Sequence, residues 1–442
     1  PADDHPRGAR RRAGRPARGD VRRTRVRVMR GVPVDVVRES ASAGRVVVWE
    51  ESARDGAQAK TLMSAEFRVR LAREQGALFG ADGPRHVVFA AGFPAVCAEE
   101  FEAVRRVAVE AEGAVSVAAV CRGVPDDVRQ AVESVRGTAH ARIMVVVPAS
   151  EAMARVMVHK GARDALDEGV GLVKQARDLG AEVAVDVCFA DASRADHALM
   201  ADYAQAMTTA GAGTIILADT VGGQLPREAA AMFTTVAERT DTDVVLGSHL
   251  HNDLGLGLAN TLRAVESGVR LVSSSWLGVA ERSGMVATEQ LLFLLGDDPV
   301  RAAAFTGGAT DLWWTPPDLT RLPAITRAVS EATGVPLTVT TPIVGSGVGT
   351  ISTGTPFVHP ALFQPFDPEA ALGIVPTVVL THLASTRVVT AVAARLGHTL
   401  DRAQATTAMA WVKSHAYRTD TAVIDDQTFS AYLDGLASRQ GA

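Results

Sequence analysis

The fold is decided by the stretch Gly247-Ser248-His249-Leu250-His251-Asn252-Asp253-Leu254-Gly255, which joins a short apolar segment to a helical one. The segment before it, Asp243–Leu246, has the composition of a strand, and Leu256–Glu266 after it has the pattern of a helix. Side chains alternate along a strand, so His249 and His251 point to the same side and can bind one metal ion together. The alternative is that one of the two histidines only caps the helix.

A second polar motif follows an apolar segment far upstream. The motif Arg54-Asp55-Gly56-Ala57-Gln58 comes shortly after Val46–Trp49, which has the composition of a buried strand. Polar groups therefore follow two strands of one repeating pattern. This repetition favours a metal site over an isolated pair of histidines.

Short β-branched segments alternate with amphipathic helical ones through most of the chain. Eight nearly all-apolar strands with helices between them predict an α/β fold, a (β/α)8 TIM barrel roughly 250 residues long in the general case, with a smaller, mostly helical C-terminal domain. Chemistry in such barrels lies at the carboxyl ends of the strands. The expected strands are Val46–Trp49, His86–Ala90, Val115–Val120, Arg142–Val147, Glu182–Val187, Thr214–Ala218, Asp243–Gly247 and Leu271–Ser274. The expected helices are Ala65–Phe79, Glu99–Glu110, Pro125–Val135, Ala162–Asp178, Ala195–Ala210, Arg227–Arg239 and Leu256–Gly268.

Three regions follow from composition. Residues 1–40 are expected to be a disordered, arginine-rich leader, because like charges repel and few large apolar residues are present to bury. The alternatives are a chain start upstream of the natural one and a nucleic-acid tail. Residues 41–300 are expected to form the barrel. Residues 301–442 are expected to form helical subdomains that cover the site or mediate dimerisation, with helices near Leu319–Thr333, Val378–Leu396 and Asp401–Tyr417.

Composition also limits the partners and the compartment. A net charge of −5 argues against a nucleic-acid surface on the body of the protein. Cys97, Cys121 and Cys188 have no metal-binding spacing and suggest no disulfide framework. No apolar run reaches the roughly 18 residues of a membrane span. We therefore expect a cytoplasmic enzyme with small-molecule partners and no nucleic acid or membrane.

The polar residues at the strand ends suggest a chemistry. One carboxylate and two imidazoles, from Asp55, His249 and His251, suit zinc, manganese, cobalt or iron, and such an ion polarises the carbonyl of a 2-oxo acid. Arg54 offers a positive charge where an oxyanion develops, or it forms only a salt bridge to its neighbour. Thr220 can hold a substrate carboxylate, or it only forms a turn after a strand.

Arg282 offers the same choice between substrate and structure. Its guanidinium can bind a substrate carboxylate, and the alternative is an ion pair with Glu281.

Several motifs occur in the order of a known family. The chain resembles the DRE-TIM metallolyase superfamily, in the branch of isopropylmalate, homocitrate and Re-type citrate synthases. The matching motifs are Arg54-Asp55-Gly56-x-Gln58, Ala91-Gly92-Phe93-Pro94-x5-Glu100-Phe101, Asp219-Thr220-Val221-Gly222, His249-x-His251-Asn252-Asp253-x-Gly255-x4-Asn260 and Gly278-Val279-Ala280-Glu281-Arg282-Ser283-Gly284.

The resemblance implies a metal-dependent acyltransferase that converts the acyl group to an alkyl group. A base takes a proton from the methyl group of acetyl-CoA, the enolate attacks the keto carbon of a 2-oxo acid, and the thioester is hydrolysed. It implies a divalent ion (manganese, cobalt, zinc or magnesium) on the same carboxylate and imidazoles, and a homodimer. The site residues assigned in this way are Arg54 and Glu281 as catalytic groups, and Gln58, Arg122, Thr220, Asn252 and Arg282 as substrate-binding groups.

This chain departs from the family pattern in several places. Met285 stands where many members carry a further ligand, asparagine, and Ala90 and Ala190 replace acidic residues. The family histidine motif of the second domain is absent, which makes His359 or His382 the candidates for the catalytic histidine. The lost acids favour a dianionic 2-oxo acid such as oxaloacetate, 2-oxoglutarate or a phosphino- or phosphonopyruvate. A 2-phosphinomethylmalate synthase-like role in antibiotic biosynthesis fits this pattern.

Two other functions remain open. A lyase of the same superfamily would use a cysteine in the loop after the eighth strand, and Trp276–Val286 contains none. A non-catalytic homologue that only binds metal or ligand is favoured by the missing histidine motif and disfavoured by the retained metal ligands.

Overall fold

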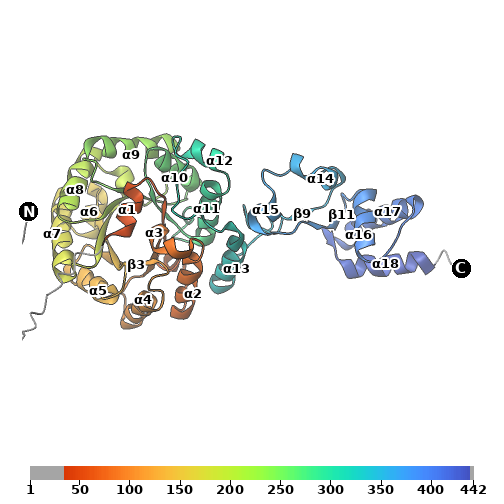
Figure 1. Cartoon of the computed structure of the whole chain (residues 1–442), viewed down its shortest axis with the longest axis horizontal. Helices are drawn as coiled ribbons and strands as arrows, with labels where there is room; N and C mark the ends of the chain where they lie inside the picture. The colour runs from red at the N-terminus through yellow and green to blue at the C-terminus, as the bar shows by residue number, and fades with distance from the viewer. Residues whose placement is uncertain (1–33, 439–442) are drawn as a thin grey trace, which may run out of the picture. The chain divides into compact units, whose positions relative to one another are not determined.

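The computed structural model describes residues 34–438, and the greater part of them forms a closed barrel of eight parallel strands (Figure 1). Each strand pairs with its neighbour in sequence, and β8 closes the barrel by pairing with β1. The predicted (β/α)8 architecture is confirmed. The strands are β1 Val47–Glu50, β2 Val87–Gly92, β3 Ser116–Arg122, β4 Arg142–Pro148, β5 Ala184–Ala190, β6 Thr214–Asp219, β7 Leu246–Leu250 and β8 Leu271–Ser274.

Helices surround this barrel, as Figure 1 shows. Their starts follow local signals: the carboxylate of Asp196 accepts hydrogen bonds from the backbone of Ala198 and Leu199 where α8 begins. The helices are α2 Ala65–Gly76, α3 Gly83–His86, α4 Ala98–Glu110, α5 Pro125–Val135, α6 Glu151–Met157, α7 Ala162–Leu179, α8 His197–Thr209, α9 Pro226–Arg239, α10 Gly257–Glu266, α11 Thr288–Gly296 and α12 Pro299–Phe305.

The seventh strand lies later in the chain than predicted. We expected Asp243–Gly247, whereas β7 is Leu246–Leu250 and contains His249. The backbone N–H of Val244 bonds to the carbonyl of Asp241, so the residues around Asp243 form a turn before the strand. His249 is therefore held by strand pairing rather than by a loop.

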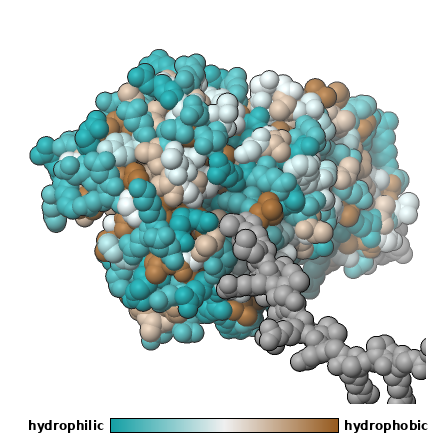
Figure 2. All heavy atoms as spheres, turned by 60° about the vertical axis from the view of Figure 1, so that its left-hand side comes forward, coloured by the Kyte–Doolittle hydropathy of each residue, from teal (hydrophilic) through white to brown (hydrophobic). Residues whose placement is uncertain are grey.

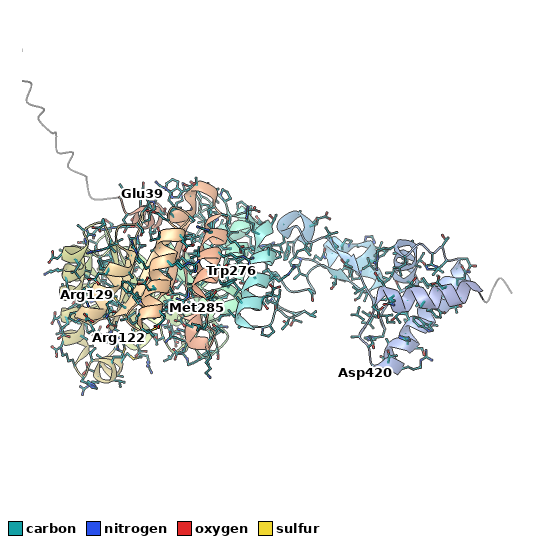
Figure 3. The ribbon with its side chains drawn as sticks, turned by 90° about the horizontal axis from the view of Figure 1, so that it is seen from below. Glu39, Arg122, Arg129, Trp276, Met285 and Asp420 are labelled. Atoms are coloured by element: carbon teal, nitrogen blue, oxygen red, sulfur yellow. The ribbon has the colours of Figure 1, made fainter. Side chains whose placement is uncertain are left out.

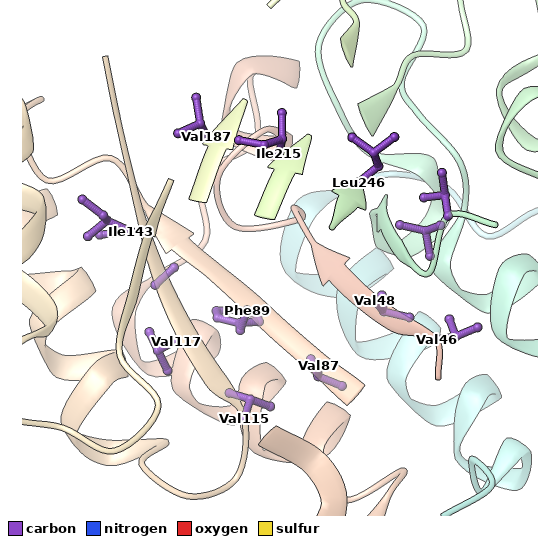
Figure 4. Close-up of a cluster of buried hydrophobic side chains, with 14 of the residues drawn as sticks. Val46, Val48, Val87, Phe89, Val115, Val117, Ile143, Val187, Ile215 and Leu246 are labelled. Carbon is purple, nitrogen blue, oxygen red and sulfur yellow. The ribbon is translucent and has the colours of Figure 1, made fainter. Parts of the chain in front are cut away.

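The strands separate two hydrophobic layers. Outward residues of neighbouring strands pack under the helices, and Figure 4 shows this layer with Val46, Val48, Val87 and Phe89. The alternate residues fill the barrel interior, which includes Val47, Trp49, Val88, Ala90, Ala118 and Val120. Burial of both faces explains why the strands are nearly all apolar.

A short helix closes the amino ends of the strands. Helix α1, Val36–Ser42, packs Val37 into the interior layer. The buried guanidinium of Arg142 in β4 binds Asp35 before this helix and Asp186 in β5.

The predicted leader extended too far along the chain. We expected residues 1–40 to be disordered, yet α1 occupies part of that range because Asp35 caps it and Arg142 anchors it. Residues 1–33 lie outside the described part of the chain.

The barrel core continues beyond the boundary expected at residue 300. Leu312, Trp313, Ile325 and Val329 belong to the same buried cluster as the outward faces of the strands. They come from the segment after α12 and from α13, Leu322–Thr333, which lies where a helix was predicted.

The rest of the C-terminal segment is mostly helical, as predicted. Buried residues such as Leu380, Val412 and Phe429 form a hydrophobic cluster of their own. The elements after α13 are β9 Thr350–Ile351, α14 Gly354–Val358, α15 Pro368–Leu372, β10 Thr377–Val378, β11 Leu380–Thr381, α16 Thr386–Arg395, α17 Arg402–Thr419, β12 Val423–Ile424 and α18 Asp426–Ser438.

One predicted helix in this segment was too long. The prediction for Val378–Leu396 is wrong for its first residues, because the β-branched run there pairs as strands before α16 begins.

Polar residues dominate the face of the molecule in Figure 2, and hydrophobic residues are scattered among them. None of the helices within residues 34–438 has the length and apolar composition needed to cross a membrane.

Candidate metal centre

The polar motifs lie at the carboxyl ends of neighbouring strands. β1 and β7 both pair with β8, so the residues that follow them share one end of the barrel. After β1 the chain turns sharply, because the backbone N–H groups of Asp55 and Gly56 both bond to the carbonyl of Glu51. This turn places the Asp55 carboxylate opposite β7.

Asp55, His249 and His251 form a buried cluster of three potential ligands. The Nε2 atoms of His249 and His251 are 3.3 Å apart. Asp55 Oδ2 lies 3.5 Å from the first of these atoms and 3.9 Å from the second. The three ligand atoms all lie within 4.8 Å of one another. The structure therefore brings together the three residues that the sequence predicted as ligands.

These distances fit a single divalent ion. Two nitrogen atoms each about 2.0–2.1 Å from a tetrahedral zinc-sized ion are roughly 3.3 Å apart. Carboxylate and imidazole donors suit zinc, manganese and cobalt. Asp55, His249 and His251 would hold the ion.

The charges in the cluster couple its residues. Burial lowers the pKa of His249, but Asp55 and Glu51 outweigh burial and raise the pKa to about 9. Burial and the neighbouring His249 lower the pKa of His251 to about 4. Burial opposes ionisation of Asp55, yet His249 and Arg54 hold the pKa of this carboxyl well below its usual range. The pKa values of the two neighbouring imidazoles are therefore shifted in opposite directions.

Arg54 neutralises the acidic side of the cluster. Its Nη1 lies 2.8 Å from Asp55 Oδ2 and 3.8 Å from Glu51 Oε2. Burial lowers the pKa of Arg54, but the two carboxylates outweigh this effect and raise it. The salt bridge considered as an alternative for Arg54 is present, and it places the side chain beside Asp55, one of the predicted ligands.

The loop after β8 closes the site from the other side. The backbone N–H of Glu281 donates to Asp55 Oδ1 at 2.9 Å, and the carbonyl of Gly284 lies 3.2 Å from His251 Nδ1. Gly284 has φ +85°, and a Cβ atom there would lie 2.1 Å from the carbonyl oxygen of Gly278. Only glycine fits this turn.

Met285 follows that turn and is buried. Its backbone pairs with that of His251 in an isolated bridge, and Figure 3 shows its place in the barrel. The position where the family pattern has asparagine is therefore beside the predicted ligands and carries a thioether.

Arg282 and Thr220 are bound to other protein groups. The Arg282 guanidinium donates to Asp253, to Glu281 and to the carbonyl of Thr220. The Thr220 hydroxyl accepts from the backbone N–H of Asp191 at 2.8 Å. The ion pair between Arg282 and Glu281 is thus present, and substrate binding by Arg282 and Thr220 stays a prediction.

The other three predicted substrate-binding residues are either exposed or bound to nearby protein groups. Gln58 is exposed in the short helix Gly56–Ala59. Arg122 ends β3 and turns to Asp127, with its Nε 2.7 Å from Oδ2. The Asn252 side chain accepts from the backbone of Gly257 and braces the start of α10.

His359 and His382 belong to the C-terminal segment. His359 is exposed after α14, and His382 packs its ring against Tyr417, with centroids 5.5 Å apart. Among the interactions of residues 34–438, no hydrogen bond or ion pair joins either histidine to Asp55, His249 or His251. A catalytic role for either one stays a prediction.

The family motif that contains Gly92, Phe93 and Glu100 stabilises the loop after β2. Glu100 accepts hydrogen bonds from both Nη atoms of the buried Arg68 and from the backbone of Phe93. Gly92 has φ +153°, and a Cβ atom there would lie 2.0 Å from Glu100 Oε1. The motif thus shapes the loop after β2.

Glu51 is a residue of this site that was not predicted from the sequence. This residue follows β1, and its fully buried carboxylate lies 3.5 Å from His249 Nδ1. Strand alternation was the available signal: Val47 and Trp49 fill the barrel interior, and Glu51 is the next residue on the same side.

Comparison with known families gives one extensive match. The profile of the family described as HMGL-like matches residues 45–329, which covers the barrel. A 2-isopropylmalate synthase of Nitrobacter winogradskyi is 33% identical over 304 residues, which cover 68% of this chain and 55% of the relative. One of Nitrosospira multiformis is 32% identical over 250 residues, 56% of this chain and 47% of the relative. The chain thus spans about half the length of these relatives.

Solved structures share the barrel. The hydroxymethylglutaryl-CoA lyase of Pseudomonas aeruginosa superposes with a TM-score of 0.52 at 21% identity, covering 65% of this chain and 93% of the lyase. The HMG-CoA lyase of Brucella melitensis gives 0.52 at 18% identity, covering 66% of this chain and 99% of the lyase. At these identities the likeness concerns the fold alone.

Proposed function

Because the chain belongs to the HMGL-like family, the DRE-TIM group, we propose that it catalyses a metal-dependent condensation of acetyl-CoA with a 2-oxo acid. The product would be a 2-hydroxy acid extended by a carboxymethyl group, together with free CoA. The observation that carries this proposal is the buried cluster of Asp55, His249 and His251 at the carboxyl ends of the strands.

The protein groups around the cluster suit this reaction. A divalent ion, when bound, supplies a Lewis acid for the keto group. Arg54 offers a fixed positive charge beside the ligands, where negative charge develops on the keto oxygen. The Asp55 carboxylate is held by the Glu281 backbone, so its position is fixed before substrate arrives.

The relatives support condensation rather than cleavage. The relatives compared above are named 2-isopropylmalate synthases. A lyase with a loop cysteine is disfavoured, because the segment 276–286 contains none. Cys188 is buried, and burial raises the pKa of its thiol to about 12, which disfavours the thiolate form.

For the substrate, we propose a 2-oxo acid with a second anionic group. Ala90 and Ala190 are small, buried and uncharged, and both occupy positions where the family pattern has acids. Oxaloacetate, 2-oxoglutarate and phosphino- or phosphonopyruvate belong to this class. Arg282 and Arg122 are the cations proposed to face the second anionic group, after exchanging their present carboxylate partners.

The proton acceptor is proposed among three residues. The Glu281 carboxylate lies in the loop after β8 and is partly exposed. His359 and His382 are the other candidates, and their role would make the C-terminal segment part of the active site, as a lid or in a homodimer. Gln58, Thr220 and Asn252 are proposed to border the substrate.

Release of free CoA tests the proposal. The protein is stripped of metal, then supplied with acetyl-CoA, one divalent ion (manganese, cobalt, zinc or magnesium) and one 2-oxo acid, including 2-oxoisovalerate as the apolar comparison. We expect thiol release that needs both a metal and an anionic 2-oxo acid. If 2-oxoisovalerate is the one 2-oxo acid of the panel that gives thiol release, the proposed condensation stands and the proposed substrate class is rejected. No release from any pair, with metal bound, would reject condensation.

A further inference from the structure

The Glu51 carboxylate is buried without a hydrogen-bond partner. The residue has no exposed surface, and neither Oε1 nor Oε2 has a hydrogen-bond partner among the described residues. Burying a carboxylate without a hydrogen-bond partner costs free energy, unless a neighbouring group pairs with it. Its two charged neighbours are His249, with Nδ1 3.5 Å from Oε1, and Arg54, with Nη1 3.8 Å from Oε2.

The three predicted ligands differ in the partner of their second polar atom, the one that does not point toward the centre of the cluster. Asp55 uses Oδ2 toward the histidines, and its Oδ1 accepts from the Glu281 backbone. His251 directs Nε2 toward the same centre, and its Nδ1 meets the carbonyl of Gly284. His249 also directs Nε2 inward, and Glu51 alone faces its Nδ1 among the described acids. His249 Nδ1 itself has no hydrogen-bond partner within residues 34–438.

We propose that Glu51 is a positioning residue: its carboxylate accepts a hydrogen bond from the Nδ1–H of His249 and so presents Nε2 to the metal. The inference rests on the proposed function only in that a divalent ion binds the cluster. The remaining gap from 3.5 Å to a hydrogen bond of about 2.8 Å closes by a small rotation of the imidazole ring.

The hydrogen bond would act in two ways. It fixes the tautomer with the proton on Nδ1, so that the Nε2 lone pair faces the cluster. The hydrogen bond also makes Nε2 a stronger electron-pair donor to the metal, because a carboxylate that accepts the Nδ1 proton raises the basicity of the imidazole. Arg54, which lies beside both Glu51 and Asp55, offsets their combined charge.

Glu50 provides a matched control for this role. It is adjacent in β1 and equally buried, but alternation turns it outward, where its carboxylate accepts hydrogen bonds from the backbone and hydroxyl of Ser52. Glu51→Ala, Glu51→Gln and Glu50→Gln therefore separate an effect on His249 from a general effect of changing a buried acid in this strand.

Metal affinity is the first measurement. Titration of the metal-free proteins with Co²⁺, followed by the visible absorption of the bound ion, gives the dissociation constants. We expect Glu51→Ala to weaken binding about 10–100-fold and Glu51→Gln to weaken it less, because the amide oxygen can still accept from Nδ1–H. Glu50→Gln should bind like the unaltered protein.

The Nδ1 protons supply a second readout. In the Co²⁺ protein, proton NMR should show strongly shifted, solvent-exchangeable signals from the two bound imidazoles, and Glu51→Gln should shift one of them. This comparison uses a substitution of nearly equal volume and keeps the test valid if Glu51→Ala does not fold.

The outcomes are distinct. Unchanged affinity in Glu51→Ala, or equal losses in Glu51→Gln and Glu50→Gln, would overturn the role of Glu51. Exchangeable signals that are identical with and without Glu51 would do the same. Failure of the unaltered protein to bind any divalent ion would overturn the proposed function, and the role of Glu51 with it.

Discussion

The Nε2 atoms of His249 and His251 lie 3.3 Å apart, with their rings inclined at 66°. In the absence of a shared ion, two imidazoles held this closely would repel once both were protonated. Burial and the neighbouring His249 lower the pKa of His251 to about 4, whereas burial at His249 is outweighed by Asp55 and Glu51, which raise its pKa to about 9. Such an arrangement suits a pair of donors to one cation.

Substitution of one histidine should remove the ion. His251→Ala deletes one of the three predicted ligands, so we expect metal content and thiol release to fall together. Metal analysis of the purified protein and the CoA assay give the two values. His197→Ala is the control, because His197 begins α8 and lies outside the cluster. Full metal content in His251→Ala would reject this residue as a ligand.

Arg54→Ala should separate binding from turnover. Removal of the guanidinium leaves the carboxylates of Asp55 and Glu51 uncompensated, which favours a cation at the cluster, so the metal should remain. Turnover should fall about 10²–10³-fold if Arg54 stabilises the oxyanion. The CoA assay and metal analysis, run on the same preparation, test both expectations.

Arg54→Lys completes that experiment. Lysine keeps the charge but lacks the planar fork of arginine, so an intermediate rate is expected. Turnover near that of the unaltered protein in Arg54→Ala would leave only the structural salt bridge as the role of Arg54.

The barrel was predictable because its strands are buried on both faces. Strands such as β2 then appear as continuous apolar segments. The bounds predicted for β8, Leu271–Ser274, are those of the structure. The last helix was not predicted. Its signals were present, because Phe429 and Leu433 are four residues apart and the Asp425 carboxylate accepts from the backbone of Thr428.

The site was predictable only where the local sequence determines geometry. Two histidines at alternate positions of a strand must share a side, and the structure shows that they do. The hydrogen bonds of the other site residues were not predictable in this way. Arg282 donates to Thr220, which is distant in the sequence, and Asn252 accepts from Gly257 through the geometry of its loop. Strand alternation from Val47 and Trp49 was a signal for the direction of Glu51, but its proximity to His249 could be known only from the structure.

Two buried acids should make stability depend on pH. Burial raises the pKa of both Glu50 and Glu289 from 4.5 to about 7. Between these values the folded protein binds more protons than the unfolded chain, so the free energy of unfolding should fall as pH rises from 5 to 8. Each group should account for a fall on the order of 3 kcal/mol in the free energy of unfolding. Urea unfolding across this range measures the slope.

Substitution of one acid tests the cause of that slope. Glu50→Gln cannot ionise, so its stability should decline less steeply between pH 5 and pH 8. Glu133→Gln is the control, because Glu133 is exposed on α5 and pairs with Arg129 on the same helix. Equal slopes in Glu50→Gln and the unaltered protein would show that Glu50 is not protonated in the folded state.

The amino end of the barrel should be sensitive to loss of Arg142. This buried guanidinium bridges Asp35 and Asp186, and Asp186 has no exposed surface. Arg142→Ala leaves the Asp186 carboxylate buried without its cation, which typically costs about 3–5 kcal/mol. Urea unfolding should show this loss. Metal content should stay the same, because Arg142 lies at the start of β4 and the predicted ligands lie at the opposite ends of the strands.

A double substitution distinguishes the charge from the packing. Arg142→Met combined with Asp186→Leu removes the charges of the fully buried pair and keeps much of the volume, so it should lose less stability than Arg142→Ala, although Asp35 still loses its cation. The Thr214 hydroxyl, which donates to Asp186 at 2.6 Å, then loses its acceptor and limits the recovery. A double variant as unstable as Arg142→Ala would show that the unpaired Asp186 carboxylate is not the cause of the instability.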